Sequence, residues 1–107
     1  MKTTIQEKKS KDYSFLLHKS LDVVNDKSTI IGNQFIVNVD NKNERLTVYC
    51  NDNPESYREF TLPFSYIDNL YSIDGDGNRL KLTVHRQKTI NKKLEEYNTW
   101  KKRNSLS

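Results

Sequence analysis

Short segments in which apolar and polar residues alternate recur along most of this chain, and this pattern restricts the fold more than any other feature. In RLKLTVHR at 79–86, Leu80, Leu82 and Val84 fall on one side of an extended chain, with polar residues between them. A period of two is typical of half-buried β-strands. We therefore predict about seven short antiparallel strands. The candidate segments are YSFLLH (13–18), LDVV (21–24), FIVNVD (35–40), RLTVYC (45–50), REFTL (58–62), YIDNLYSI (66–73) and RLKLTVHR (79–86).

Polar turn residues separate these segments. DNKNE at 40–44 joins two alternating runs, so we expect a hairpin between 35–40 and 45–50. The stretch SIDGDGN at 72–78 supplies Asp-Gly and Gly-Asn pairs, which suit a tight reversal into the last alternating segment. The chain contains no alanine, the best helix former, and this lowers the expectation of an all-α fold.

The pattern changes to a helical period near the C-terminus. Within residues 88–103, Ile90, Leu94, Tyr97 and Trp100 are spaced so that they form one stripe on a helix. We expect a terminal amphipathic helix that lies on the sheet and closes part of its core.

The net charge of +4 is unevenly distributed. Residues 1–12 carry four lysines against two acids, residues 13–85 carry seven basic residues against ten acids, and residues 86–107 carry seven against two. The first segment also lacks apolar periodicity, so we predict a disordered basic N-terminal tail there. A single domain is expected over 13–103, followed by a short C-terminal tail at 104–107.

The cluster of aspartates and glycines before the last strand does not have the spacing of a calcium loop. Counted from Asp74, the residues Asp76 and Asn78 fit the third and fifth positions. Arg79 and His85 stand at the sixth and twelfth positions, where such a loop needs Gly and a bidentate Glu. The stretch therefore predicts a turn.

Residues that could form another metal site or a catalytic pair are few. Cys50 ends an alternating strand on its apolar face, where we expect a small buried thiol. His85 falls on the polar face of its strand and is expected in solvent. His18 is the other histidine of the chain. No close pair of His, Cys or acidic residues has the spacing of zinc ligands. We expect a non-catalytic protein with no cofactor and no metal.

Several short strands followed by a helix with a tryptophan resemble the pleckstrin-homology-like (PH-like) superfold. LEEYNTWKKR at 94–103 is similar to the helix of that family, and Trp100 matches its characteristic tryptophan. FTLPFSYIDNLYSI at 60–73 looks like its middle strands. The resemblance covers 13–103 and implies an α+β, mostly β, fold in which an antiparallel sandwich or barrel is closed by the terminal helix.

The resemblance does not extend to the residues that bind phosphoinositides in some members of the family. Those members carry closely spaced Lys and Arg in the first hairpin. The corresponding region here offers His18, Lys19 and Lys27, with Asp22 and Asp26 between them. Phosphoinositide binding is therefore not expected.

Two classes of function fit these patterns. We favour a protein-interaction module that binds another protein or a peptide segment, through a groove beside the terminal helix or along a sheet edge. Three tyrosines expected to be exposed would contact that partner. The alternative is a binder of nucleic acid or an anionic lipid surface that uses the basic helix. The candidate residues are Tyr49, Tyr57, Tyr66, Lys92, Lys93, Lys101, Lys102 and Arg103.

The sequence also carries information about location. No apolar run approaches the length needed to cross a bilayer. The N-terminal residues MKTTIQEKKSKD lack the apolar centre of a secretory signal. We expect an intracellular protein, in the cytoplasm or nucleus.

Calcium is predicted to leave the stability of the protein unchanged, because Arg79 and His85 occupy the positions of essential loop residues. Thermal unfolding curves recorded with calcium and with a chelator should superimpose. A ligand that binds only the native state must raise the midpoint, so a shift of several degrees would contradict the prediction.

Overall fold

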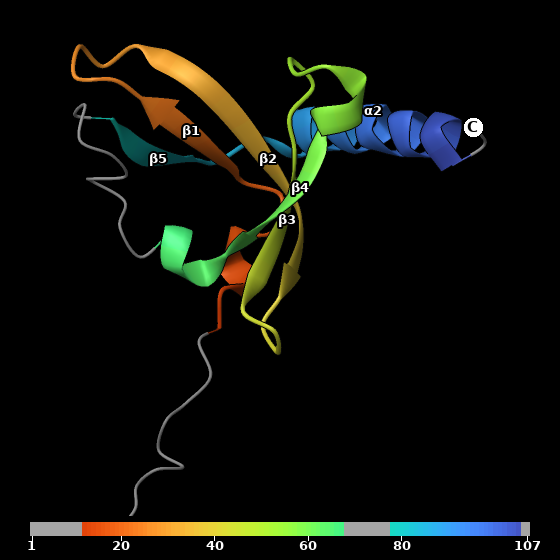
Figure 1. The fold of residues 1–107 in the computed structure, drawn as a ribbon, viewed down its shortest axis with the longest axis horizontal. Helices are drawn as coiled ribbons and strands as arrows, with labels where there is room; N and C mark the ends of the chain where they lie inside the picture. The colour runs from red at the N-terminus through yellow and green to blue at the C-terminus, as the bar shows by residue number, and fades with distance from the viewer. Residues whose placement is uncertain (1–11, 68–77, 106–107) are drawn as a thin grey trace, which may run out of the picture.

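The computed structural model describes residues 12–67 and 78–105 of the 107-residue chain. Within these ranges it contains a five-stranded antiparallel sheet followed by one long α-helix (Figure 1). The strands are β1 (Ser20–Val24), β2 (Ile30–Asp40), β3 (Arg45–Tyr49), β4 (Glu59–Pro63) and β5 (Arg79–Thr83). The helix is α2 (Gln87–Ser105), and three short 3-10 helices are η1 (Ser14–Leu16), η2 (Glu55–Tyr57) and η3 (Phe64–Tyr66).

The strand order in the sheet is β4-β3-β2-β1-β5. The first four strands follow one another as hairpins, and β5 then returns to pair with the outer side of β1. The predicted hairpin between β2 and β3 is confirmed, with Asp40 opposite Arg45. In its turn, the Asp40 carboxylate accepts hydrogen bonds from the backbone N–H and the side-chain amide of Asn43. Glu44 completes the reversal with a positive φ of 55°.

The prediction of about seven strands in a closed sandwich or barrel is wrong in its strand count and in closure. The described residues form five strands in one open sheet, with β4 and β5 as its edges. YSFLLH is not a strand, because residues 14–16 turn as η1 and only Leu16 is buried. Tyr66 ends η3, and most of the strand expected over 66–73 lies outside the described residues, as does most of the SIDGDGN turn.

The main core lies on one face of the sheet. Register places Leu21 opposite Leu82, and Ile36 opposite Val48. Leu16 of η1, Phe64 of η3 and Ile67, which follows η3, cover this face from outside the sheet. The buried cluster consists of Leu16, Leu21, Ile36, Leu46, Val48, Phe64, Ile67 and Leu80. In β3 the buried Leu46 and Val48 are two residues apart, as the period-two pattern predicted, whereas β2 has a shift in register between Ile36 and Asn38.

Helix α2 does not complete this core. It packs on Tyr49, which follows the core residue Val48 in β3 and therefore points to the opposite face of the sheet. Figure 1 shows the helix crossing one end of the sheet and continuing beyond it. Of the predicted stripe only Trp100 is buried, whereas Ile90, Leu94 and Tyr97 are half-buried. The expected helix is thus confirmed, but its predicted role in closing the core is wrong.

This arrangement predicts unequal costs for two leucine truncations. Leu46→Ala should lower the free energy of unfolding by about 2–5 kcal/mol, because Leu46 is fully enclosed by the main core. Leu94→Ala should cost about 1 kcal/mol or less, because its side chain is only half-buried. Urea denaturation of both variants measures the difference. Equal losses would mean that α2 contributes to the core as much as β3 does.

Candidate functional site

The contact between α2 and the end of the sheet is built from aromatic rings. Tyr49 of β3 lies with its ring centroid 5.4 Å from that of Tyr97 and 5.6 Å from that of Trp100. Tyr97 and Trp100 are one helical turn apart, so both can face the same strand residue. Together with Glu59 and Lys101 these residues form what we call the helix seam.

Polar groups fix the helix seam on its β4 side. Lys101 Nζ donates to the two carboxylate oxygens of Glu59 at 3.1 and 2.9 Å, and the Tyr97 hydroxyl donates to the same carboxylate. Burial raises the pKa of the Glu59 carboxyl, but the bonds from Tyr97 and Lys101 outweigh burial and hold the pKa below its ordinary value. The bond to Glu59 also raises the pKa of Lys101. The carboxylate and the ammonium therefore both stay charged at neutral pH.

Two hollows flank the helix. One, of about 240 Å³, is lined by Glu59, Trp100, Lys101 and Asn104. The other, of about 310 Å³, is lined by Asn51, Thr89, Lys92, Lys93 and Glu96. The Trp100 indole N–H is buried and has no acceptor within the part of the chain that the structure describes. A buried donor without an acceptor costs free energy.

The structure separates the candidate residues that the sequence suggested. The prediction that Tyr49 is exposed is wrong, because α2 covers it and it is only 4% exposed. Tyr66 is half-buried and packs against the main core, whereas Tyr57 on η2 is 68% exposed. Lys92 and Lys93 line one hollow and Lys101 the other. The remaining two, Lys102 and Arg103, are exposed on the last turns of α2.

Sequence reasoning missed a second cluster on the same face of the sheet, which we call the Phe35 cluster. The buried ring of Phe35 has the His18 ring at 6.1 Å and the His85 ring at 6.0 Å between centroids, and Lys93 Nζ at 5.6 Å from its centroid. His85 Nε2 lies 2.6 Å from Ser20 Oγ, and Ser20 is fully buried. Alternation correctly placed His85 on the polar face, but α2 covers that face, so His85 is half-buried and not solvated as predicted.

The Phe35 cluster brings a serine, a histidine and an aspartate close together without the geometry of a nucleophilic relay. The Asp22 carboxylate is bonded by the Asn33 amide and by Thr83 Oγ1, the latter at 2.5 Å, and not by His85. Ser20 is 0% exposed, so a substrate carbonyl cannot reach its hydroxyl. The bond between Ser20 and His85 is therefore structural in this conformation.

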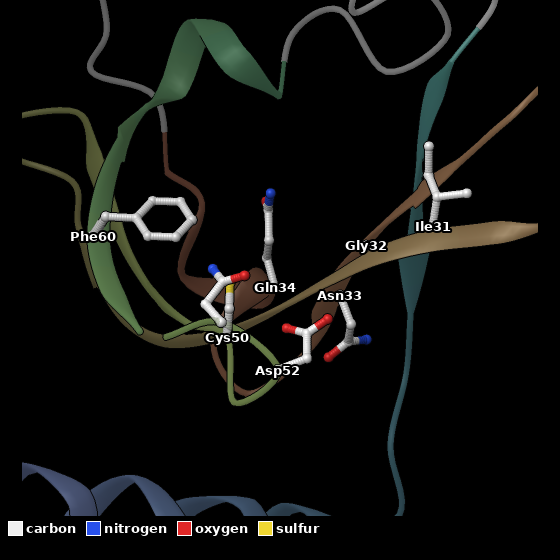
Figure 2. Close-up of a pocket in the computed structure, with 8 residues that line it drawn as sticks. Ile31, Gly32, Asn33, Gln34, Cys50, Asp52 and Phe60 are labelled. Carbon is white, nitrogen blue, oxygen red and sulfur yellow. The ribbon is translucent and has the colours of Figure 1, made fainter. Parts of the chain in front are cut away.

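A third, smaller hollow of about 130 Å³ lies beside Cys50 (Figure 2). Gln34, Asp52 and Phe60 are among the residues that line it. Burial and the nearby Asp52 carboxylate raise the pKa of the Cys50 thiol to about 11. The thiol is therefore protonated at neutral pH, as expected for an unreactive buried cysteine.

Among residues 12–67 and 78–105, no group of three or more His, Cys, Asp or Glu side chains is placed to hold a metal ion. Over the same ranges, no helix has both the length and the apolar character needed to cross a membrane.

Comparison with protein-family models, with curated protein sequences and with solved structures finds no match to this chain.

The polar part of the helix seam predicts a pH-dependent stability difference. Glu59→Gln removes a carboxylate whose pKa is lowered on folding, so wild type should be the more stable above the ordinary carboxyl value of 4.5. As the pH falls below 4.5 the folded carboxyl protonates, and the difference between the two proteins should disappear. Urea denaturation at several pH values measures it. An unchanged difference at acid pH would show that Glu59 acts through packing and not through its charge.

Proposed function

We propose that this protein is a non-catalytic interaction module that binds a segment of another protein along α2, on its half-buried apolar stripe and the adjoining helix seam. The observation that carries this proposal is the incomplete burial of α2. A 19-residue helix presents an apolar stripe, yet Ile90, Leu94 and Tyr97 remain half-buried. An amphipathic helix in a single domain normally buries such a stripe, so the uncovered part offers apolar surface to a partner.

The hollow beside Trp100 is a second observation in favour of a partner-binding site on α2. It combines an aromatic wall with charged and amide groups at its rim, which is the composition of sites that anchor one side chain of a partner.

The outer edge of β4 offers backbone groups next to this hollow. Cys50 N–H bonds to Arg58 O and Phe64 N–H bonds to Glu44 O, so even-numbered residues of this strand face β3. The N–H groups of Glu59 and Thr61 therefore face outward, where no described strand pairs with β4. A partner strand on this edge would bring its side chains to the hollow that Glu59 also lines.

The PH-like resemblance remains part of this proposal. An antiparallel sheet followed by a C-terminal helix whose tryptophan packs on the sheet supports it. Many members of that superfold bind peptides or proteins, which agrees with the interaction proposed here. We also keep the intracellular location as a prediction, and the protonated, buried thiol of Cys50 suits a reducing compartment.

A second candidate function is binding to nucleic acid or another anionic surface. It is favoured by the hollow lined by Thr89, Lys92 and Lys93, which gathers two ammonium groups near the start of α2. The same hollow contains Glu96, which would repel phosphate. The two candidates differ in their response to salt, because phosphate binding weakens steeply as salt concentration rises.

The test uses peptides selected from a random library on the wild-type protein. Asn104→Trp fills the hollow beside Trp100 and should weaken peptide binding at least about tenfold, which corresponds to about 1.4 kcal/mol. Thr99→Trp adds the same side chain to an exposed position of α2 and serves as the control. Titration calorimetry measures both, and circular dichroism checks that both variants fold.

Equal affinities of the two tryptophan variants would place peptide binding outside the helix seam. Lys92→Glu distinguishes the second candidate, because Lys92 is exposed and lines only the basic hollow. Loss of binding to a short DNA duplex in this variant, with steep salt dependence in wild type, would favour the anionic surface.

A further inference from the structure

Both histidines of the chain lie against one buried phenylalanine. The His18 ring stacks nearly parallel to Phe35, with an interplanar angle of 10°, and the His85 ring meets it at 54°. Lys93 of α2 places its ammonium over the same ring. Phe35 itself is 1% exposed, so these three side chains form much of its cover on this face.

His85 occupies the junction between the sheet and the helix. It lies two residues after Thr83, where β5 ends, and two residues before Gln87, where α2 begins. Its hydrogen bond to the fully buried Ser20 ties this junction to β1. The position of the first turns of α2 therefore depends on His85 and on the contact of Lys93 with Phe35.

We propose that His85 is an acid-sensitive latch, whose neutral imidazole holds the first half of α2 against the sheet and whose protonation releases it. The proposal concerns the protein alone and does not rest on the interaction proposed above. If both are correct, acid would change the surface that α2 presents to a partner.

The charges that face His85 oppose its protonation. Burial and the Lys93 ammonium of α2 lower the pKa of His85, while the Asp22 carboxylate of β1 acts in the opposite direction. Both oxygens of Asp22 already accept hydrogen bonds, one from Asn33 and one from Thr83. The net effect of these neighbours is that the pKa of His85 is lowered. The His18 imidazole lies across the Phe35 ring from this group of charges.

The hydrogen bond between Ser20 and His85 also opposes protonation of His85. A neutral imidazole has one ring nitrogen that accepts and one that donates, so Ser20 can donate to His85 Nε2. In the tautomer whose proton is on Nδ1, protonation makes Nε2 a donor as well, and the Ser20 hydroxyl must then turn to another acceptor in a buried site. The imidazolium would also be repelled by the Lys93 ammonium, which contacts the same Phe35 ring.

The sign of the effect follows from the lowered pKa. Above the ordinary histidine value of 6.5, both the docked and the released forms hold neutral His85 and the latch is closed. As the pH falls below 6.5, the released form binds a proton more readily than the docked form, and the docked form loses stability.

Two-dimensional NMR of the wild-type protein between about pH 7.5 and about pH 5 tests this latch. The His85 ring signal and the backbone amides of residues 87–94 should shift together, with one midpoint below 6.5. Lys93→Met removes the like charge but keeps an apolar chain over Phe35, so the midpoint should rise toward 6.5. The indole signal of Trp100, the one tryptophan of the chain, reports whether the far end of α2 also moves.

His85→Gln keeps a group that can bond to Ser20 but cannot take up a proton, so the amide transition should vanish. His18→Gln is the matched control at the same ring and should retain the transition. A His85 midpoint at or above 6.5, or an amide transition that persists in His85→Gln or disappears in His18→Gln, would overturn the proposal. If His85→Gln does not fold, the wild-type midpoint and its movement in Lys93→Met decide the question.

Discussion

The pairing of β1 with β5 is the contact on which the rest of the structure depends. It joins segments about sixty residues apart, as in the hydrogen bond from Thr83 to Asp22. Because α2 starts four residues after β5 ends, this pairing also fixes where the helix begins. The main core, the Phe35 cluster and the helix seam all follow from that placement. The entropy of closing such a long loop is repaid only when the apolar residues on both strands are buried together.

The central strands are buried on both faces, and the two faces differ in the side chains that they bury. One face carries the main core, with aliphatic side chains from four strands. The other face carries Ser20, Asp22, Phe35 and Tyr49, which are all nearly or fully buried. The polar groups of its strands bond to one another, as Asp22 does to Asn33 and Thr83, whereas the Trp100 indole N–H of the covering helix has no acceptor among the described residues. Hydrogen-bonded buried polar groups specify one arrangement of neighbours, so the bonds of Asp22 help to fix how β5 lies against β1.

The sequence was informative wherever a local pattern determined the structure. The β2–β3 hairpin follows from alternation and a polar turn, and α2 follows from the spacing of Ile90, Leu94, Tyr97 and Trp100. It was misleading where a distant element decided burial. Period two shows which residues share a face but not what covers that face, so Tyr49 and His85 were both expected in solvent. YSFLLH was misread because short apolar runs do not distinguish a strand from a turn of 3-10 helix.

The helix is held at two places by chemically different contacts. Toward its C-terminus the helix seam combines edge-on and tilted aromatic contacts with an ion pair, in which the pKa of the Glu59 carboxyl lies below its ordinary value of 4.5. Toward its N-terminus the Phe35 cluster depends on the neutral imidazole of His85. Below pH 6.5 the docked form loses stability relative to the released form, because the released form binds a proton more readily. Acid therefore acts first on the N-terminal contact, over a pH range in which the ion pair is intact. With the C-terminal contact as a pivot, the half-buried Ile90 and Leu94 belong to the part of the helix that this order of events would free.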